Sequence, residues 1–283
     1  MNNVNNILAI IVLYKTNYVD AVTFQAMEKA MEGLNGSLDM VIYDNSPESR
    51  GCAENFVHGK LNIHYKHDSG NGGVSAAYNY GAEYAAKMPA KQWVLLLDQD
   101  TSFESAILAK YAQALTQFPD IKLFAPILKL SGGEIFSPCR FKFKRGFRLE
   151  KINPGRCSLR QISPVNSGML INLVSFFQAG GYNEKVKLDF SDFQFIERFK
   201  KTQQEFYIID STGFQDFSNA EIDPEKLDLR YAFFCDGAKH FERVIFTDHL
   251  QLFIVAFMRA VTLALRTRKL IFFRTFYNSY LKS

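Results

Sequence analysis

The feature of the sequence that most constrains its fold is an unbroken apolar run, Trp93 to Leu97, that stops at Asp98-Gln99-Asp100. A short continuous apolar run is typical of a strand buried on both faces in the middle of a parallel sheet. Further apolar runs at 7–14, 40–43 and 61–65 alternate with stretches whose apolar residues recur at helical spacing. This alternation predicts an α/β fold in which crossover helices flank a mixed, mainly parallel sheet.

The second half of the chain is less regular. Thr101-Ser102-Phe103-Glu104 has the form of a capping box, which predicts that a helix begins there. Strands are expected at 122–126, 169–173 and 206–209, and a short helix at 193–199. Residues 131–162 carry several glycines, prolines and basic residues, a composition typical of a surface excursion.

The charge of the chain is unevenly distributed. Its formal net charge of +4 comes from 33 basic and 29 acidic residues. Residues 242–283 hold seven of the basic and two of the acidic residues, a balance of +5, so the chain upstream sums to −1. A nucleic-acid-binding protein would carry a stronger basic bias. We therefore expect a main α/β domain over residues 1–240, a C-terminal amphipathic basic helical segment over 241–283, and no nucleic-acid partner.

Compartment and targeting signals are weak. The four cysteines are widely separated and form no CxxC pair, so reduced thiols are expected rather than a zinc site or disulfides. The apolar run at 7–14 lacks a basic flank and a cleavage site, and we interpret it as a buried strand. Residues 250–258 are apolar, but Arg259, Arg266 and Arg268 interrupt them before a membrane-spanning length is reached. The expectation is a cytoplasmic protein with no transmembrane helix.

Acidic residues follow the predicted strands at Asp44, Asp68, Asp98 and Asp100. Ligands of open α/β sheets bind at the carboxyl ends of the strands. For Asp44 or Asp68 alone, a turn or helix cap is the favoured interpretation. Asp98 and Asp100 stand two residues apart after a buried strand, and such a pair can bind a hard divalent cation that also takes substrate phosphates. The alternative for this pair is a solvated turn with a helix cap at Thr101.

Several motifs carry a resemblance to a known family. They are the strand ending at Tyr14, the strand ending in Asp44-Asn45, and the run Asn71-Gly72-Gly73-Val74-Ser75-Ala76-Ala77-Tyr78-Asn79-Tyr80-Gly81. Together with Leu95-Leu96-Leu97-Asp98-Gln99-Asp100 they resemble glycosyltransferase family 2, over roughly residues 5–212. The sequence Leu97-Asp98-Gln99-Asp100-Thr101 is similar to the rhamnosyltransferase-like branch of that family.

The resemblance implies the GT-A fold and a nucleotide-sugar donor whose diphosphate is bound through Mn²⁺ or Mg²⁺ at Asp100 and Asp98. It implies a set of donor-binding residues, namely Tyr14, Asp44, Asn71, Gly72, Asn79, Asp98 and Gln99. It further implies transfer of a sugar to a hydroxyl of a growing, lipid-linked polysaccharide, with dTDP-rhamnose as the favoured donor. The alternatives are a UDP-hexose or galactofuranose donor, or a non-catalytic sugar-binding module recruited to membranes.

The second half supplies the implied catalytic base. Asn166-Ser167-Gly168-Met169-Leu170-Ile171 resembles the segment before the acceptor site, and Gly180-Gly181-Tyr182-Asn183-Glu184 resembles a turn of the family. The stretch 188–194 resembles the acidic motif in which an Asp six residues before an Arg, here Arg198, is the base. That spacing implies Asp192, with Asp189 as the alternative. An inverting transfer needs one general base on the protein. The other interpretation of Asp192 is a plain helix cap.

Two departures from the family pattern concern the metal and the donor. Many relatives place a histidine after the next strand, but Ser211-Thr212-Gly213-Phe214-Gln215-Asp216 contains none. Asp216 is a possible replacement ligand, or the site does without one. Arg230-Tyr231-Ala232-Phe233-Phe234-Cys235-Asp236-Gly237 follows the branch only in part, which weakens the assignment of the donor sugar. A nucleotidyltransferase would need a Gly-rich basic loop near the first strand, and Asn17-Tyr18-Val19-Asp20 is not one.

From Asp248 onward, apolar and aromatic residues are interleaved with arginine and lysine, and no acid follows. Such a helical stretch can lie in an anionic membrane interface. The alternative is a terminal helix that packs its apolar face on the main domain. The membrane interpretation predicts a peripheral protein on the inner face of the cell membrane.

Overall fold

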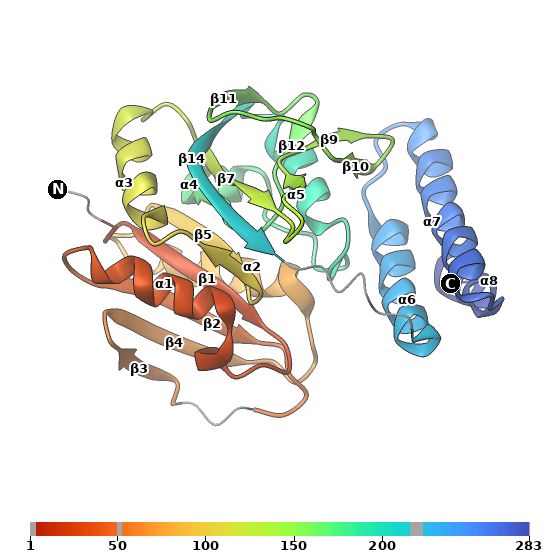
Figure 1. The fold of residues 1–283 in the computed structure, drawn as a ribbon, viewed down its shortest axis with the longest axis horizontal. Coiled ribbons are helices and arrows are strands. Elements are labelled where there is room, and N and C mark those ends of the chain that lie inside the picture. The colour runs from red at the N-terminus through yellow and green to blue at the C-terminus, as the bar shows by residue number, and fades with distance from the viewer. Residues whose placement is uncertain (1–3, 50–52, 216–222, 283) are drawn as a thin grey trace.

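The computed structural model describes residues 4–49, 53–215 and 223–282, and its centre is one large mixed sheet (Figure 1). Strands β5 (Trp93–Asp98), β1 (Ile7–Leu13), β2 (Leu38–Asp44) and β4 (Leu61–His67) lie side by side and parallel, in that order. The antiparallel β3 (Asn55–His58) closes this half. The other half continues through β13 (Leu170–Asn172), β7 (Leu123–Lys129), β14 (Glu205–Gln215) and β11 (Gly155–Ser158). The predicted α/β fold with a mainly parallel sheet is confirmed.

Helices cover both faces of the sheet, which explains the continuous apolar runs. Ile7, Ala9 and Ile11 of β1 belong to the apolar cluster of α1 (Val22–Glu32) and α3 (Ile107–Gln117). Leu8, Ile10 and Val12 belong to the cluster of α2 (Gly73–Ala86), α4 (Leu173–Gln178) and α5 (Ser191–Phe199). Every residue of β1 is therefore buried. Each residue adds hydrophobic stabilisation, whereas in a strand with one face in solvent only every second residue would do so. A short 3-10 helix, Tyr18–Asp20, links β1 to α1.

The capping box predicted at 101–104 is wrong. Thr101–Phe103 forms a short strand, β6, that pairs antiparallel with the end of β14, and helix α3 begins only at Ile107. The Thr101 hydroxyl contacts Ser167 Oγ at 2.8 Å instead of capping a helix. Tertiary partners unavailable to local sequence reasoning thus decide this segment.

The excursion at 131–162 contains strands rather than only loop. β8 (Ile135–Ser137) pairs with β7, and a small sheet is formed by β9 (Cys139–Lys142), β10 (Arg145–Phe147) and β12 (Ile162–Ser163). Lys144 at the turn of the β9–β10 hairpin forms an ion pair with Asp248 at 3.1 Å, which fixes the hairpin against the C-terminal helices. Cys139, Cys157 and Cys235 are free thiols, and Cys52 lies outside the described residues.

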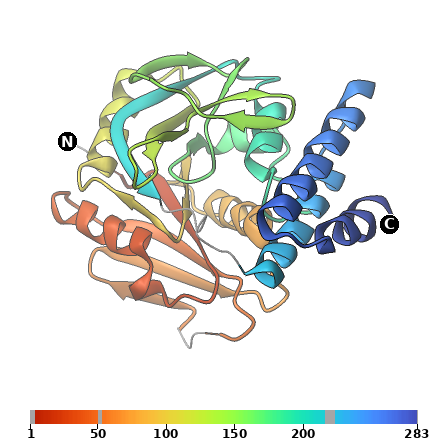
Figure 2. The ribbon, with the colours of Figure 1, turned by 45° about the vertical axis from the view of Figure 1, so that its right-hand side comes forward.

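Three helices form a group at one side of the sheet, as Figures 1 and 2 show: α6 (Pro224–His240), α7 (Phe246–Thr267) and α8 (Ile271–Phe276), followed by a π-helical turn, Tyr277–Leu281. They share an apolar cluster of their own that also takes in Val186 and Phe190 of the main domain. The Tyr231 hydroxyl of α6 donates to the Ala256 carbonyl of α7 at 2.8 Å. The helical tail is present as predicted, and α6 packs with it. The boundary at residue 240 stays a prediction.

Helix α7 differs from the expectation that no segment reaches a membrane-spanning length. Its 22 residues are long and apolar enough to cross a bilayer by length and composition, despite Arg259. Only 28% of its most apolar window is buried. The expectation that the arginines interrupt this segment before a membrane-spanning length is therefore wrong as to length and composition. Its buried side, which includes Leu252, Ala256 and Ala260, belongs to the cluster shared with α6 and α8.

Candidate active site

Asp98 and Asp100 lie at the carboxyl edge of the parallel strands. Asp98 is the last residue of β5, and the buried Tyr78 hydroxyl of α2 donates to its Oδ1 at 2.9 Å. Gln215 at the end of β14 donates from Nε2 to Asp100 Oδ1 at 2.7 Å. One helix and two strand ends therefore hold the pair where α/β folds bind ligands.

Burial and a neighbouring acid disfavour the charged form of Asp98. Loss of contact with water raises the pKa of Asp98 to about 6, and the neighbouring Asp100 carboxylate adds to the rise. Burial and the Asp98 charge raise the pKa of Tyr78 well above its ordinary value, so its hydroxyl stays a donor. Two carboxylates that disfavour each other's ionisation are the electrostatic setting that a divalent cation relieves.

Gln99, between the two aspartates, faces the end of β1. Its Oε1 accepts a hydrogen bond from the Tyr14 backbone N at 2.8 Å, and its carbonyl accepts from the Thr23 N at 3.2 Å. The Tyr14 ring is 43% exposed and stands at the rim of the edge. The structure thus gives Gln99 a role in shaping the edge, whereas the ring of Tyr14 is accessible to a planar ligand group.

Asp44 is held differently from Asp98. Its side chain is fully buried; its Oδ1 accepts from the Ser46 N at 2.9 Å and its Oδ2 from the Tyr65 hydroxyl at 2.7 Å. Both carboxylate oxygens are satisfied inside the protein. Its contact with a nucleotide stays a prediction.

Asp68 organises the loop that contains two predicted donor-binding residues, Asn71 and Gly72. Its carboxylate accepts from the backbone N of Gly70 at 3.0 Å and of Gly72 at 2.8 Å, and from the Tyr43 hydroxyl at 2.9 Å. Burial alone would raise the pKa of Asp68, but these hydrogen bonds bring it below the ordinary value. Asn71 takes a positive φ of 49° in this tight turn. Asp68 therefore acts as a structural anchor for the loop.

The start of α2 packs on the segment before the acidic motif. Gly73 has a φ of +81°, and a Cβ there would collide with the Lys187 carbonyl, so only glycine fits. The Asn79 side chain exchanges two hydrogen bonds with the backbone of Tyr182, at 2.8 and 3.0 Å. The structure therefore brings Asn79 to the 182–187 turn, and its predicted donor contact remains untested.

Asp192 lies in the first turn of α5, as predicted, and its Oδ1 accepts from the Phe193 N at 2.7 Å. The residue at the cap position is Phe190, with a φ of 73°, so Asp192 is not the helix cap. Burial raises the pKa of Asp192 to about 7, and the charges of Asp189 and Asp98 add to the rise. A base that titrates near neutral pH is well matched to proton abstraction under physiological conditions. Burial also raises the pKa of Asp189.

Two adjacent residues join the Asp98 turn to the Asp192 helix. Ser167 Oγ accepts from the Asp98 N at 3.4 Å and contacts the Thr101 hydroxyl. Asn166 Nδ2 donates to Ser191 Oγ at 3.1 Å, at the start of α5. This Asn166–Ser167 bridge fixes the two acidic groups relative to each other.

Two tyrosines lie between the same acidic groups. The rings of Tyr78 and Tyr182 are 5.3 Å apart, and the Tyr182 hydroxyl donates to Asn166 Oδ1 at 2.7 Å. The sequence motifs contain both residues, but they did not predict these contacts. The available signal was chemical: a buried tyrosine needs a hydrogen-bond partner, and Tyr78 falls on the apolar face of a helix that approaches the strand ends.

Arg198, six residues after Asp192, positions α5. Its guanidinium donates to the Gly181 carbonyl at 2.9 Å and to Glu242 Oε1, also at 2.9 Å, just beyond α6. The arginine of the motif therefore ties α5 to the 180–181 turn and to the C-terminal helices.

The donor set fits a hard divalent cation in part. Asp98 and Asp100 supply two carboxylates, the number by which Mg²⁺ is often held when substrate phosphates complete its coordination. Within residues 4–49, 53–215 and 223–282, no group of three or more His, Cys, Asp or Glu side chains is placed to hold a metal. The possible third ligand, Asp216, lies outside the described residues.

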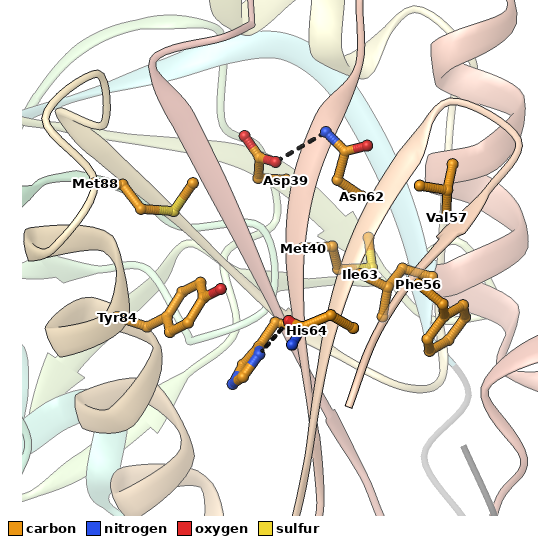
Figure 3. Close-up of a pocket in the computed structure, with 10 residues that line it drawn as sticks. Asp39, Met40, Phe56, Val57, Asn62, Ile63, His64, Tyr84 and Met88 are labelled. Carbon is orange, nitrogen blue, oxygen red and sulfur yellow. Dashed lines mark hydrogen bonds between the residues drawn. The ribbon is translucent and has the colours of Figure 1, made fainter. Parts of the chain in front are cut away.

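A pocket at the opposite edge of the sheet is not part of this site (Figure 3). It lies near the beginnings of β2 and β4, beside the end of α2, and has a volume of about 310 Å³. Its polar groups bond to each other: Asn62 donates to Asp39 at 3.0 Å, and His64 contacts Asn55 at 2.8 Å. The carboxyl edge, where the acids gather, is the better candidate.

The sequence and the fold were compared with known proteins. Residues 25–159, somewhat less than half of the chain, match the family model Glycosyl transferase family 2. The fold is similar to residues 1–349 of S. aureus TarS, with a TM-score of 0.57 and 13% identity over 97% of this chain and 78% of that one. The same part of TarS in complex with UDP-GlcNAc gives a TM-score of 0.52 and 13% identity over 96% and 79%.

GalNAc-T7 with UDP, GalNAc and Mn²⁺ is a further similar structure, with a TM-score of 0.53 and 10% identity. The match covers 87% of this chain and 53% of that one. No curated protein matches the sequence. At these identities the likeness shows the fold, and the expected GT-A architecture is confirmed.

Proposed function

We propose that this chain is an inverting glycosyltransferase of family 2 that moves a sugar from a nucleotide sugar to an acceptor hydroxyl. The observation that carries the proposal is the pairing of two acidic groups at one sheet edge. Asp98 and Asp100 stand where a donor diphosphate would bind, and Asp192 stands across the Tyr78–Tyr182 contact. The family match of residues 25–159 supports the same assignment.

In the proposed reaction Asp192 takes the proton of the acceptor hydroxyl. The acceptor oxygen forms a bond to the anomeric carbon while the bond from that carbon to the diphosphate oxygen breaks. The nucleoside diphosphate leaves with the bonding electrons, and the configuration at the anomeric carbon inverts. Asp189, also half-buried nearby, is the alternative base.

Asp98 and Asp100 would hold the divalent cation, Mn²⁺ or Mg²⁺, with Asp216 as a possible further ligand. When bound, such a cation neutralises charge on the leaving diphosphate. The GalNAc-T7 structure contains Mn²⁺, which supports the choice of metal. Tyr78 and Gln215 keep the two carboxylates oriented through their hydrogen bonds.

We propose dTDP-rhamnose as the donor, because the Leu97–Thr101 motif resembles the rhamnosyltransferase-like branch. A UDP-linked sugar is the second candidate, and UDP or UDP-GlcNAc in the similar structures favours it. The proposed donor contacts remain Tyr14, Asp44, Asn71, Gly72, Asn79, Asp98 and Gln99. Of these, the exposed Tyr14 ring is best placed to contact the base of the nucleotide.

We further propose a peripheral position on the inner face of the cell membrane and a lipid-linked oligosaccharide acceptor. The support is the outer surface of α7, where apolar side chains are exposed; Phe246 is 87% and Leu265 76% exposed. Asp248, the last acid of the chain, is buried and paired with Lys144, so the exposed charges beyond it are basic. Apolar and basic groups together suit an anionic bilayer surface.

A membrane-binding test should alter the surface without removing the helices. Deleting residues 248–283 would uncover the apolar cluster shared with α6, so paired substitutions Phe246→Glu and Leu265→Glu are preferable. Val57→Glu, at a 70% exposed site on β3, is the matched control. Partitioning onto phosphatidylglycerol vesicles should fall for the α7 variant alone, and equal partitioning of all three proteins would contradict the membrane assignment.

The enzymatic proposal is tested by a thermal-shift panel of nucleotide sugars with and without Mn²⁺ or Mg²⁺, followed by a transfer assay with the stabilising donor. One nucleotide sugar should raise the melting temperature in the presence of metal, because a ligand that binds only the native state stabilises it. EDTA should remove the shift, and Asp100→Asn should reduce it. If a nucleotide sugar stabilises the protein but no nucleoside diphosphate is released in the transfer assay, the chain is a non-catalytic sugar-binding module and the enzymatic proposal is wrong.

A further inference from the structure

Four arginines belong to three elements that pack near Asp189 and Asp192, the two candidate bases. Arg145 belongs to β10, Arg230 to α6, and Arg259 and Arg266 to α7. These four residues are called the arginine cluster below. None of them belongs to the donor-binding or metal-binding residues described above.

Helix α6 places Arg230 next to the loop that holds Asp189. Gly237 of α6 lies against this loop so closely that a Cβ there would be 2.5 Å from the Asp189 carbonyl oxygen. Phe234 packs on Phe190 with ring centroids 4.7 Å apart. Arg230 precedes Phe234 by four residues and Gly237 by seven, so all three share one face of the helix.

Helix α7 adds its arginines at the same point. The Arg259 guanidinium lies over the Phe234 ring, 5.9 Å from its centroid. Arg266 follows Arg259 by seven residues, two turns further along the same face of α7. The contact between α6 and α7 is therefore also where their arginines meet the Asp189 loop.

The β9–β10 hairpin brings Arg145 from the other direction. The neighbouring Gly146 lies against Phe193, the residue after Asp192, and a Cβ there would be 2.8 Å from the Phe193 ring. The ion pair between Lys144 and Asp248 holds the hairpin turn on α7. Arg145 is thus fixed near both the base helix and α7.

The charges of the cluster are close enough to act on one another. Burial lowers the pKa of Arg259; Asp189 opposes this effect, whereas Arg230, Arg145 and Arg266 add to it. Burial raises the pKa of Asp189 even though Arg230 and Arg259 attract its charged form. Asp189 therefore lies close enough to Arg230 and Arg259 for both to attract its charged form.

We propose that the arginine cluster binds a phosphate or diphosphate ester beside the catalytic base, carried by the acceptor or by a lipid headgroup. Guanidinium groups bind phosphate oxygens through paired hydrogen bonds, and several of them converging from rigid elements form a specific anion site. The donor diphosphate would lie at the metal pair, so this is a second anion site. Its role in acceptor binding rests on the proposed function; the binding itself does not.

The first test measures binding of inorganic pyrophosphate to the full chain by titration calorimetry in EDTA, so that the Asp98–Asp100 pair repels rather than attracts the anion. The variant Arg230→Gln/Arg259→Gln removes two charges of the cluster. The control Lys29→Gln/Lys87→Gln removes two exposed charges on the main domain, away from the C-terminal helices. We expect affinity to fall about tenfold or more in the cluster variant and less than about twofold in the control.

A second arm identifies the source of the phosphate. The same proteins are mixed with vesicles of phosphatidylglycerol and phosphatidylcholine. Weaker pyrophosphate binding by the cluster variant with unchanged vesicle binding assigns the site to a phosphate on the acceptor. Weaker vesicle binding alone assigns it to lipid headgroups. If the cluster variant matches its control in both arms, the proposal is overturned.

Folding and catalysis are kept apart from this test. Arg259 stacks on Phe234, so Arg230→Gln alone is measured as well, with melting temperatures of all variants as the check on folding. Arg230→Lys retains the charge but not the paired hydrogen bonds and should lose part of the affinity. The pyrophosphate titration requires no sugar transfer. If Asp192 is not the base, the transfer assay will show it, and pyrophosphate binding will be unchanged.

Discussion

Two groups of acids at the same sheet edge are held in opposite ways. Asp44 is the last residue of β2 and Asp68 follows β4, and their carboxylates accept hydrogen bonds from hydroxyl and backbone donors. Asp98 and Asp192 lie where burial and neighbouring acids raise the pKa. The contrast separates acids that build the edge from acids that are set up to bind or react, a distinction that position alone does not reveal.

The largest effect is expected at Asp192. Asp192→Asn should reduce sugar transfer about 10²–10⁴-fold, because it removes the proposed general base, while the thermal shift caused by the nucleotide sugar persists. Asp210→Asn, at an exposed acid on β14, is the matched control and should leave transfer within about twofold of the wild type. Retention of transfer within tenfold in the Asp192 variant would transfer the role to Asp189.

Asp44 should behave as a structural acid. Asp44→Asn leaves a buried donor, the Tyr65 hydroxyl or the Ser46 N, without a full partner, which should lower the free energy of unfolding by about 1–3 kcal/mol. Asp98→Asn at pH 8 should be neutral or stabilising, because it removes one of two repelling charges. Urea denaturation of both variants checks the difference, and equal losses would erase the contrast between the two groups.

The pH dependence of stability sharpens the same contrast. The pKa of Asp192 is about 7 in the folded chain and 3.8 is its reference value, so the folded state holds a proton that the unfolded state loses between about pH 4 and 7. Stability attributable to this group therefore falls as pH rises through that window. In EDTA, Asp192→Asn should raise the free energy of unfolding by about 1–2 kcal/mol at pH 8 and leave it unchanged near pH 3.5.

Activity should depend on pH in the opposite direction. Because Asp192 must be ionised to accept a proton, the transfer rate should rise with pH and level off above about pH 7. Melting curves and initial rates collected over one pH series would show both trends. A rate that is flat from pH 5 to 8 would contradict the assignment of this group as the base.

The smallest effect is expected at Tyr182, a positioning residue. Tyr182→Phe removes the hydroxyl that donates to Asn166 and should lower kcat about three- to tenfold, with little change in the donor KM. The pH at which the rate levels off should also shift, because Asn166 holds the start of the base helix. Phe176→Leu, a nearby core change without a hydroxyl, is the control; an unshifted pH profile in the Tyr182 variant would mean that the contact is only structural.

Sequence patterns were sufficient for the parts of the fold that depend on local periodicity. The run at 93–97 predicted a central strand because both of its faces are buried, and the helix expected at 193–199 placed Asp192 near a helix start. They failed at 101–104, where pairing with β14 outweighs a local capping signal. They also missed the partners of Tyr78 and Tyr182, because these contacts join residues about 20 and 16 positions apart in ways no periodicity encodes.

In the C-terminal segment, too, the sequence predicted local structure but not tertiary packing. Its helical, basic character was readable from the sequence, but the union of α6 with α7 and α8 depends on tertiary packing. The arginine cluster was equally hidden, since its members come from positions 145, 230, 259 and 266. The close approach of Gly237 to the Asp189 loop and of Gly146 to the Phe193 ring brings their elements together.

The Asn166–Ser167 bridge has a consequence for how such a site can diversify. Two adjacent residues set the spacing between the turn after β5 and the start of α5. The Ser167 side chain is hydrogen-bonded to that turn, and the Asn166 side chain is hydrogen-bonded to Ser191 at the start of α5. Insertions in the hairpin at 139–147 or in the C-terminal helices could remodel what enters the site without altering that spacing. For the proposed reaction, we therefore expect selectivity and reaction geometry to depend on separate parts of the chain, which makes each open to separate re-engineering.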